Sequence, residues 1–297
     1  MFDTFIQLMV EIPAYFYTTV FLVSLMVGSF LNVVIHRLPK MLEKEWLCEC
    51  REFLADELLQ TPKLKKDEKP YNLVEPRSNC PSCGHQITAL ENIPVISWLV
   101  LRGKCSACKT DISPRYPLVE LLTAVLSLVV AMIAGANVLT LCFIVITWAL
   151  IALSFIDFDT MLLPDEITLP LIWFGLGASA MGIGIAPTDA IAGAIVGYMS
   201  LWTINWIFSK IKSQQGMGQG DFKLMAVFGA WLGWQDVFLI TFLSSFVGAI
   251  FGIIILYAQK KGKDTHIPFG PYIAIAGWVV MLWGDDITNF YLQNYFY

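Results

Sequence analysis

The chain has 297 residues, of which 57% are hydrophobic and 14% are charged, and its formal net charge is −5. This composition is too apolar and too poor in charge for an average soluble domain, and it excludes a basic protein built to bind nucleic acid. No Lys or Arg occurs between Arg115 and Lys210, and these 94 residues can hold four bilayer crossings of about 20 residues each. The composition therefore predicts a membrane protein.

Hydropathy predicts an all-α polytopic membrane protein with about eight transmembrane helices. The predicted spans are residues 14–36, 116–134, 138–156, 167–185, 188–208, 222–235, 237–258 and 269–284. Segments 222–235 and 269–284 are short for a hydrocarbon core of about 30 Å, so we expect them to be tilted, half-buried or re-entrant. The first segment lacks a preceding basic region and is long enough to span, so we expect it to be retained rather than cleaved as a signal peptide.

The positions of Lys and Arg predict the orientation, because these residues favour cytoplasmic loops. Thirteen of the 19 lie in residues 37–115, three lie in residues 210–223, and three lie in residues 260–263. With eight spans and the N-terminus outside, all three groups fall on the cytoplasmic side. Asp and Glu, but no Lys or Arg, remain on the other side. We therefore expect the large loop 37–115 in the cytoplasm.

This loop contains two C-x2-C pairs separated by 21 residues, Cys80 with Cys83 and Cys105 with Cys108. Each pair places two sulfurs on one tight turn, and two such turns can close a tetrahedral site. The pattern is typical of a structural zinc site with four thiolate ligands. Because the loop has few aliphatic residues, we expect the metal to supply much of its folding energy.

Two other uses of these cysteines are less favoured. Disulfides are rare in the cytoplasm, and a redox C-x2-C would need a βαβ context that is not visible. Cys48 and Cys50 are interpreted as free thiols or spare metal ligands, and His85 as a loop residue rather than a fifth ligand. Residues 62–70, rich in Lys, are predicted to be a solvated connector or a contact to anionic headgroups.

Two aspartates stand in otherwise apolar sequence, Asp157 after the third predicted span and Asp221 before the sixth. An ionisable residue near bilayer depth is costly and therefore marks a functional site. The topology puts both at the cytoplasmic face, although 63 residues lie between them. The glycines before Asp221 predict an irregular turn with positive φ or close backbone approach, and Pro164 predicts that the third helix ends nearby.

Two facing carboxylates suit acid/base activation of water. At about 3 Å two like charges cannot both ionise near neutrality, so one keeps a proton while the other accepts one from water. The apparent pKa values then belong to the pair. Asp159, Asp165 and Glu166 are most simply solvated loop charges, and Asp159 remains an alternative partner to Asp157.

Seven elements in this order resemble the bacterial prepilin peptidases, which belong to the G-x-G-D membrane aspartic proteases. The resemblance covers nearly the whole chain and rests on GSFLNVVIHRLP (28–39), RSNCPSC (77–83), NIPVISW (92–98), LRGKC (101–105), ISPRYPLVE (112–120), DFDTMLLPD (157–165) and GQGD (218–221).

The resemblance implies a bifunctional enzyme of the bacterial inner membrane that serves type IV pili or type II secretion. It implies that Asp157 and Asp221 are the catalytic pair, which cuts the short basic leader of prepilins and pseudopilins after a glycine. It implies that the new N-terminal residue is then methylated with S-adenosylmethionine, in a domain organised by zinc on the four cysteines. Gly103 lies in the element linked with methyl transfer, although a glycine at a tight turn is also an ordinary structural feature. The pocket for the methyl donor is not located, because no G-x-G-x-x-G on a βα unit occurs.

These interpretations divide the chain into a first transmembrane helix (1–36), a cytoplasmic zinc-binding domain linked to methyl transfer (37–115) and a transmembrane aspartic peptidase domain (116–297). A transporter would explain the acids but predicts internal repeats, which are not evident. A zinc-binding scaffold without activity would leave the aspartates without a role.

Overall fold

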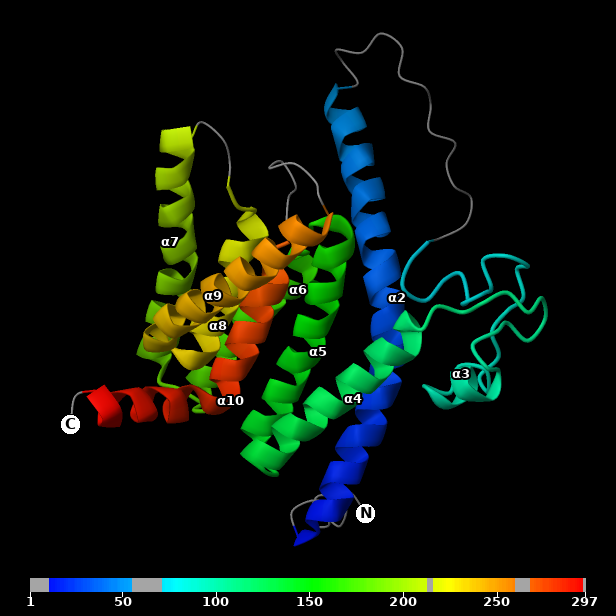
Figure 1. The fold of residues 1–297 in the computed structure, drawn as a ribbon, viewed down its shortest axis with the longest axis horizontal. Coiled ribbons are helices and arrows are strands. Elements are labelled where there is room, and N and C mark those ends of the chain that lie inside the picture. Colours follow the sequence, from blue (N-terminus) through cyan, green and yellow to red (C-terminus); the bar gives the residue numbers. More distant parts are fainter. Residues whose placement is uncertain (1–10, 55–70, 213–215, 260–267, 296–297) are drawn as a thin grey trace. The chain divides into compact units, whose positions relative to one another are not determined.

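The structure is a computed structural model that describes residues 11–54, 71–212, 216–259 and 268–295. It is almost entirely helical (Figure 1), and its described parts hold no β-strand beyond two isolated bridges. The predicted connector 62–70 and the basic group 260–263 lie outside the described residues. The helices are α2 (Pro13–Leu54), α3 (Ile96–Val100), α4 (Arg115–Ala134), α5 (Val138–Thr160), α6 (Asp165–Ala180), α7 (Pro187–Lys212), α8 (Gln219–Leu232), α9 (Trp234–Gln259) and α10 (Gly270–Tyr295).

Each of the eight predicted spans coincides with a helix, but the count of eight membrane crossings is not confirmed. Five of the described helices, α2, α4, α5, α7 and α9, are long and apolar enough to cross a bilayer. Helices α6 and α8 have 16 and 14 residues, fewer than the roughly 20 that a full crossing needs. Helix α10 carries Asp285 and Asp286 within its length.

Helix α2 is longer than the sequence predicted. It continues past residue 36, through Pro39, to Leu54, and its 42 residues correspond to about 63 Å. The expected end was wrong because the residues that follow Pro39 are mostly good helix formers such as Met, Leu, Glu and Lys.

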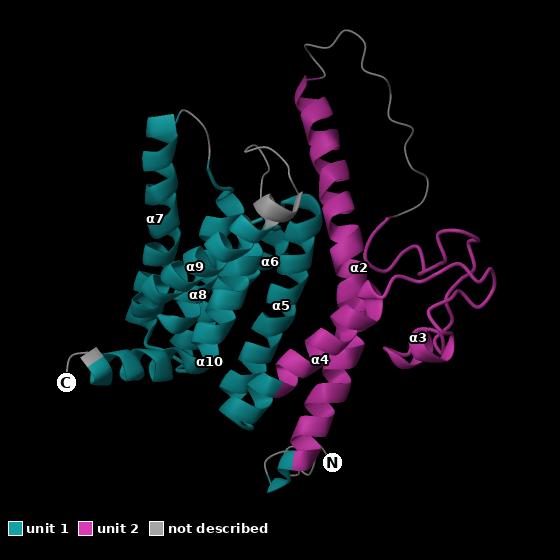
Figure 2. Cartoon of the chain, in the orientation of Figure 1, with its two compact units in different colours: residues 1–13, 129–297 teal, residues 14–128 magenta. Residues whose placement is uncertain are grey.

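The chain divides into two compact units (Figure 2), unit 1 with residues 1–13 and 129–297, and unit 2 with residues 14–128. In unit 2, α2 and α4 approach closely at Gly28. A Cβ built there would lie 2.7 Å from the Glu120 Cα atom. Gly28 therefore permits a contact between the two helices that a larger residue would prevent.

In unit 1, α8 packs against α6, α7, α9 and α10. Its long apolar side chains are fully buried, among them Phe222, Leu224, Met225, Val227 and Phe228. The contact between α7 and α8 rests on glycine, as is common where membrane helices pack closely. A Cβ at Gly193 would overlap the Gly229 carbonyl, and one at Gly197 would lie 2.6 Å from the Met225 carbonyl oxygen. A short helix, α8, is thus held at the centre of this unit.

Candidate active site and metal centre

Asp157 lies in the last turn of α5 and is 5% exposed. It was expected to follow this helix, but the helix continues to Thr160 and ends at Met161, which adopts the left-handed conformation and donates its N–H to the Asp157 carbonyl. The side-chain Oδ2 of Asp157 accepts the backbone N–H of Gly270 at 3.0 Å. Gly270 begins α10, and a helix N-terminus favours a negative charge.

Asp221 lies in the first turn of α8 and is 7% exposed. Gly218, the residue before the helix, has an extended backbone, and a Cβ built on it would lie 3.7 Å from the Asp221 Oδ2. The irregular segment expected before Asp221 is present in residues 216–218, which are not helical, but none of Gly216, Gly218 and Gly220 has the positive φ that was allowed for. The expected close backbone approach does occur, at Gly220.

Leu163 connects the two aspartate-bearing elements. A Cβ built on Gly220 would lie 2.6 Å from the Leu163 Cβ, and one built on Gly270 would lie 3.0 Å from the Leu163 Cδ1. Both glycines therefore pack against one side chain of the loop between α5 and α6. Asp157 and Asp221 are near enough to interact electrostatically. The structure thus brings together the two aspartates that the sequence singled out, while Asp159 is exposed on the last turn of α5.

The sequence did not lead us to predict an ion pair that lies beside Asp157 and Asp221. The Lys223 Nζ atom lies 2.7 Å from both Oδ1 and Oδ2 of Asp165. Asp165 is therefore not the solvated loop charge that was expected. It is the first residue of α6, and it joins the segment after Asp157 to the helix that carries Asp221. The signal available in the sequence was the position of Lys223, two residues after Asp221, in a segment with few other cations.

The four cysteines of the two C-x2-C pairs converge, and this cluster can hold a metal ion. The sulfurs of Cys80, Cys83, Cys105 and Cys108 all lie within 4.8 Å of one another. The Sγ atoms of Cys80 and Cys108 are 3.8 Å apart, which is about the edge of a tetrahedron of thiolates around zinc at about 2.3 Å. None of the four is in a disulfide. The donor set and spacing fit zinc.

The two C-x2-C turns have the same backbone pattern. In the first, Cys80 donates its N–H to His85 and accepts from Gly84; in the second, Cys105 donates to Thr110 and accepts from Lys109. Gly84 and Lys109, at equivalent positions, both have positive φ, 73° and 61°. Each turn therefore presents its two sulfurs in the same way. The two turns can form one site although 21 residues separate them in the sequence.

Glu91 lies beside the first C-x2-C turn. Its carboxylate pairs with His85 at 3.3 Å and accepts the N–H and hydroxyl of Thr88 at 2.9 Å. Interactions with Ser106 of the second turn and with Thr88 lower the pKa of Glu91 to about 2. His85 is thus a partner of Glu91, consistent with its interpretation as a loop residue.

Gly103 is packed beneath an aromatic ring. Its φ is +68°, a Cβ there would lie 2.9 Å from the Trp98 ring, and its carbonyl accepts the Ile112 N–H at 2.7 Å. The Trp98 indole in turn donates to the Ile112 carbonyl at 3.1 Å. Gly103 therefore has a clear structural reason to be glycine, and its link to methyl transfer remains a prediction.

Comparison with known proteins gives consistent matches along the chain. Residues 22–134 match the bacterial peptidase A24 N-terminal domain, and residues 144–253 match the type IV leader peptidase family. A prepilin leader peptidase/N-methyltransferase of Aeromonas salmonicida (strain A449) is 54% identical over 283 residues, 95% of this chain and 96% of that protein. Proteins with the same name from Pseudomonas aeruginosa (52% over 281 residues, 95% of each chain) and Legionella pneumophila (43% over 285 residues, 96% of this chain and 97% of that protein) are also similar. No solved structure matches the chain.

Proposed function

Because the chain belongs to the type IV leader peptidase family, we propose that it cleaves the short basic leader of type IV prepilins or pseudopilins after a glycine and then N-methylates the new N-terminal residue. The observation that carries this proposal is the pairing of two buried carboxylates, Asp157 and Asp221, at the adjoining ends of two helices. We assign the catalytic role in cleavage to these two residues.

In the proposed cleavage, one carboxylate of the pair is protonated and the other is ionised, as expected for close like charges. The ionised carboxylate takes a proton from water, and the resulting nucleophile attacks the scissile carbonyl, whose oxygen is protonated by the other carboxylic acid. The C–N bond then breaks and the leaving nitrogen accepts a proton. The hydrogen bond from Gly270 to Asp157 supports Asp157 as the ionised member.

We propose three functional parts of the chain, a first transmembrane helix (1–36), a zinc-binding domain for methyl transfer (37–115) and a peptidase domain (116–297). In the second part, Cys80, Cys83, Cys105 and Cys108 would hold zinc, whose role there is to fix the fold of the loop. Gly103 would keep the turn before Cys105 in position. When bound, S-adenosylmethionine would supply the methyl group for the new N-terminal nitrogen, which would lose a proton in exchange.

We further propose that the protein lies in the bacterial inner membrane with its N-terminus outside and both the zinc-binding domain and the aspartates at the cytoplasmic face. The distribution of Lys and Arg supports this orientation. A prepilin, a hydrophobic helix preceded by a basic leader, would then present its scissile bond at the depth of the aspartates. Glu166, exposed on the first turn of α6, is a better candidate than Asp165 to meet the leader, because Asp165 already pairs with Lys223.

The test uses the purified full-length protein, a prepilin and labelled S-adenosylmethionine, with the products followed by intact mass. We expect Asp157→Asn and Asp221→Asn each to lower the cleavage rate by about 100-fold or more, as for loss of a general acid or base. Asp159→Asn is the matched control and should cleave at the rate of the unaltered protein. Cleavage at that rate by Asp157→Asn would refute the assignment.

A further inference from the structure

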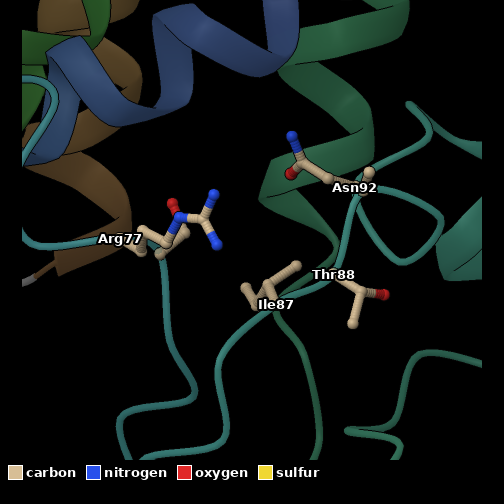
Figure 3. Close-up of a pocket in the computed structure, with 6 residues that line it drawn as sticks. Arg77, Ile87, Thr88 and Asn92 are labelled. Atoms are coloured by element: carbon tan, nitrogen blue, oxygen red, sulfur yellow. The ribbon is translucent and has the colours of Figure 1, made fainter.

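An open cavity of about 480 Å³, most of whose lining residues are exposed, lies in unit 2 of the chain (Figure 3). This volume is in the range of small-molecule and cofactor sites. The residues that line it are Arg77, Ser78, Ile87, Thr88, Ala89 and Asn92. They come from two elements with family resemblance but no assigned role, RSNCPSC and NIPVISW, and from the turn between them.

The Arg77 side of the cavity is anchored to α2 by a buried charge. Arg37, which is 8% exposed, donates from Nη1 to the Asn72 carbonyl at 2.8 Å and from Nη2 to the Pro76 carbonyl at 2.6 Å. Pro76 immediately precedes Arg77. The backbone that carries Arg77 is therefore fixed by a charged side chain whose hydrogen bonds go to carbonyl groups rather than to another charge.

The Asn92 side is anchored in the same way to α4. Glu120, also 8% exposed, accepts the Val95 N–H at 2.7 Å. Val95 has a φ of 61°, which is rare and costly for a β-branched residue. Such strain persists only where surrounding contacts fix it, and it is concentrated at functional sites. The positive φ of Val95 fixes the backbone direction three residues after Asn92.

Two exposed polar side chains that line the cavity have no partner within the described part of the chain. Neither the Arg77 guanidinium nor the Asn92 side-chain amide makes a hydrogen bond or ion pair with any described residue, whereas the Thr88 hydroxyl is taken by Glu91. In Figure 3 the guanidinium and the amide both extend into the space between the two backbones that carry them. The cavity thus combines fixed walls with two donors available to a ligand.

We propose that this cavity binds S-adenosylmethionine, with Arg77 on the carboxylate of its methionine part and Asn92 on the edge of its adenine. The inference rests on the proposed methyl transfer, which requires a donor site that the sequence does not reveal. A guanidinium matches a carboxylate through two parallel hydrogen bonds, an Asn amide can pair with adenine N6 and N7, and Ile87 offers an apolar surface between them. The group that receives the methyl, the pilin N-terminal amine, is not an anion and does not match Arg77.

The test measures S-adenosylmethionine binding to the full-length protein in detergent by titration calorimetry, together with methylation of a pilin that has already lost its leader. We expect Arg77→Ala and Asn92→Ala to weaken binding by about 10- to 100-fold, as for loss of hydrogen bonds to a charged group or a bidentate pair. Arg77→Lys, which keeps the charge but loses the fork, should show a smaller defect. Arg51→Ala, on α2 and outside the cavity lining, is the matched control.

Leader cleavage and bound zinc, measured on the same samples, report whether each variant is folded. If Arg77→Ala does not fold, Arg77→Lys and Asn92→Ala decide the question. Unchanged affinity in folded variants would overturn the inference. If the variants keep their affinity for S-adenosylmethionine but bind more weakly to vesicles that contain phosphatidylglycerol, the inference is also overturned. The cavity would then hold a lipid headgroup. Failure of the unaltered protein to bind or use S-adenosylmethionine would instead refute the proposed methyl transfer itself.

Discussion

The carboxylate of Asp157 depends on the absence of a side chain at Gly270. The Gly270 N–H donates to Asp157 Oδ2 at 3.0 Å, and a Cβ at Gly270 would lie 2.7 Å from the same oxygen. No methyl group fits at that distance without moving the carboxylate or the start of α10. Gly270 therefore acts as a positioning residue through its backbone.

We expect Gly270→Ala to reduce leader cleavage by about 100-fold, because a displacement of about 1 Å at reacting groups has effects of that size. The variant should remain folded, with a normal thermal unfolding profile. Gly177→Ala in α6 is the matched control, since a Cβ there meets nothing within 4 Å. Full cleavage by Gly270→Ala would show that Asp157 does not need this contact.

For single residues, the sequence predicted the carboxylates of the site but not the backbone N–H groups that hydrogen-bond to them. Asp157 and Asp221 could be predicted because carboxylates in apolar sequence carry a chemical signature. Gly270 could not, because a backbone N–H carries none and it lies 113 residues from its acceptor. Asp165 was misassigned for a related reason, since its partner Lys223 is 58 residues away.

Among the helices, α6 and α8 are joined near their N-terminal ends by the pair of Lys223 and Asp165. This contact fixes the segment that follows Asp157 against the helix that begins with Asp221. Lys223 is 22% exposed and Asp165 47% exposed, so the free energy of the pair itself is modest. Its effect should appear in the geometry of the site rather than in overall stability.

We expect Lys223→Met and Asp165→Asn each to lower kcat for cleavage by about 10-fold, with little change in KM or in thermal stability. The exchanged double variant, Lys223→Asp with Asp165→Lys, should recover part of the loss because the pair is restored with reversed sign. Steady-state kinetics with a prepilin measure both parameters. An effect on KM alone would indicate that Asp165 binds the leader instead.

The contact between α7 and α8 has no room for a side chain at Gly193. We expect Gly193→Ala to destabilise the protein by about 1 to 3 kcal/mol, the usual cost of overpacking, and to lower the thermal midpoint in detergent by several degrees. Gly177→Ala serves again as the control. An unchanged midpoint for Gly193→Ala would mean that these helices separate at little cost.

The positions of the helices followed closely from hydropathy, since each predicted span coincides with one. Their lengths did not, for two physical reasons. The part of α2 that follows Pro39 is polar and is helical because its residues have high helix propensity. A search for apolar segments does not detect such a helix. Helices α6 and α8 are apolar but short, and hydropathy does not distinguish a short helix packed against its neighbours from one that crosses the bilayer.

For the molecule as a whole, two compact units correspond to two proposed reactions. We expect removal of the metal with a strong chelator, or the Cys80→Ser and Cys105→Ser double change, to abolish methylation while leaving cleavage within about twofold. The reason is that the loop takes much of its folding energy from the metal, whereas the aspartates lie in the other unit. Parallel assays of both reactions on one preparation measure this, and equal loss of both would show that the units depend on each other.

The hydrogen bond between Gly270 and Asp157 also bears on biosynthesis. The aspartates are both present once residue 221 has been made, but Asp157 lacks its backbone donor until the start of α10 has been synthesised and inserted. A nascent or truncated chain that ends before Gly270 would therefore carry both acids in an unfinished arrangement. Proteolytic competence would arise only near the end of translation, so incomplete chains would not act on substrate in the membrane.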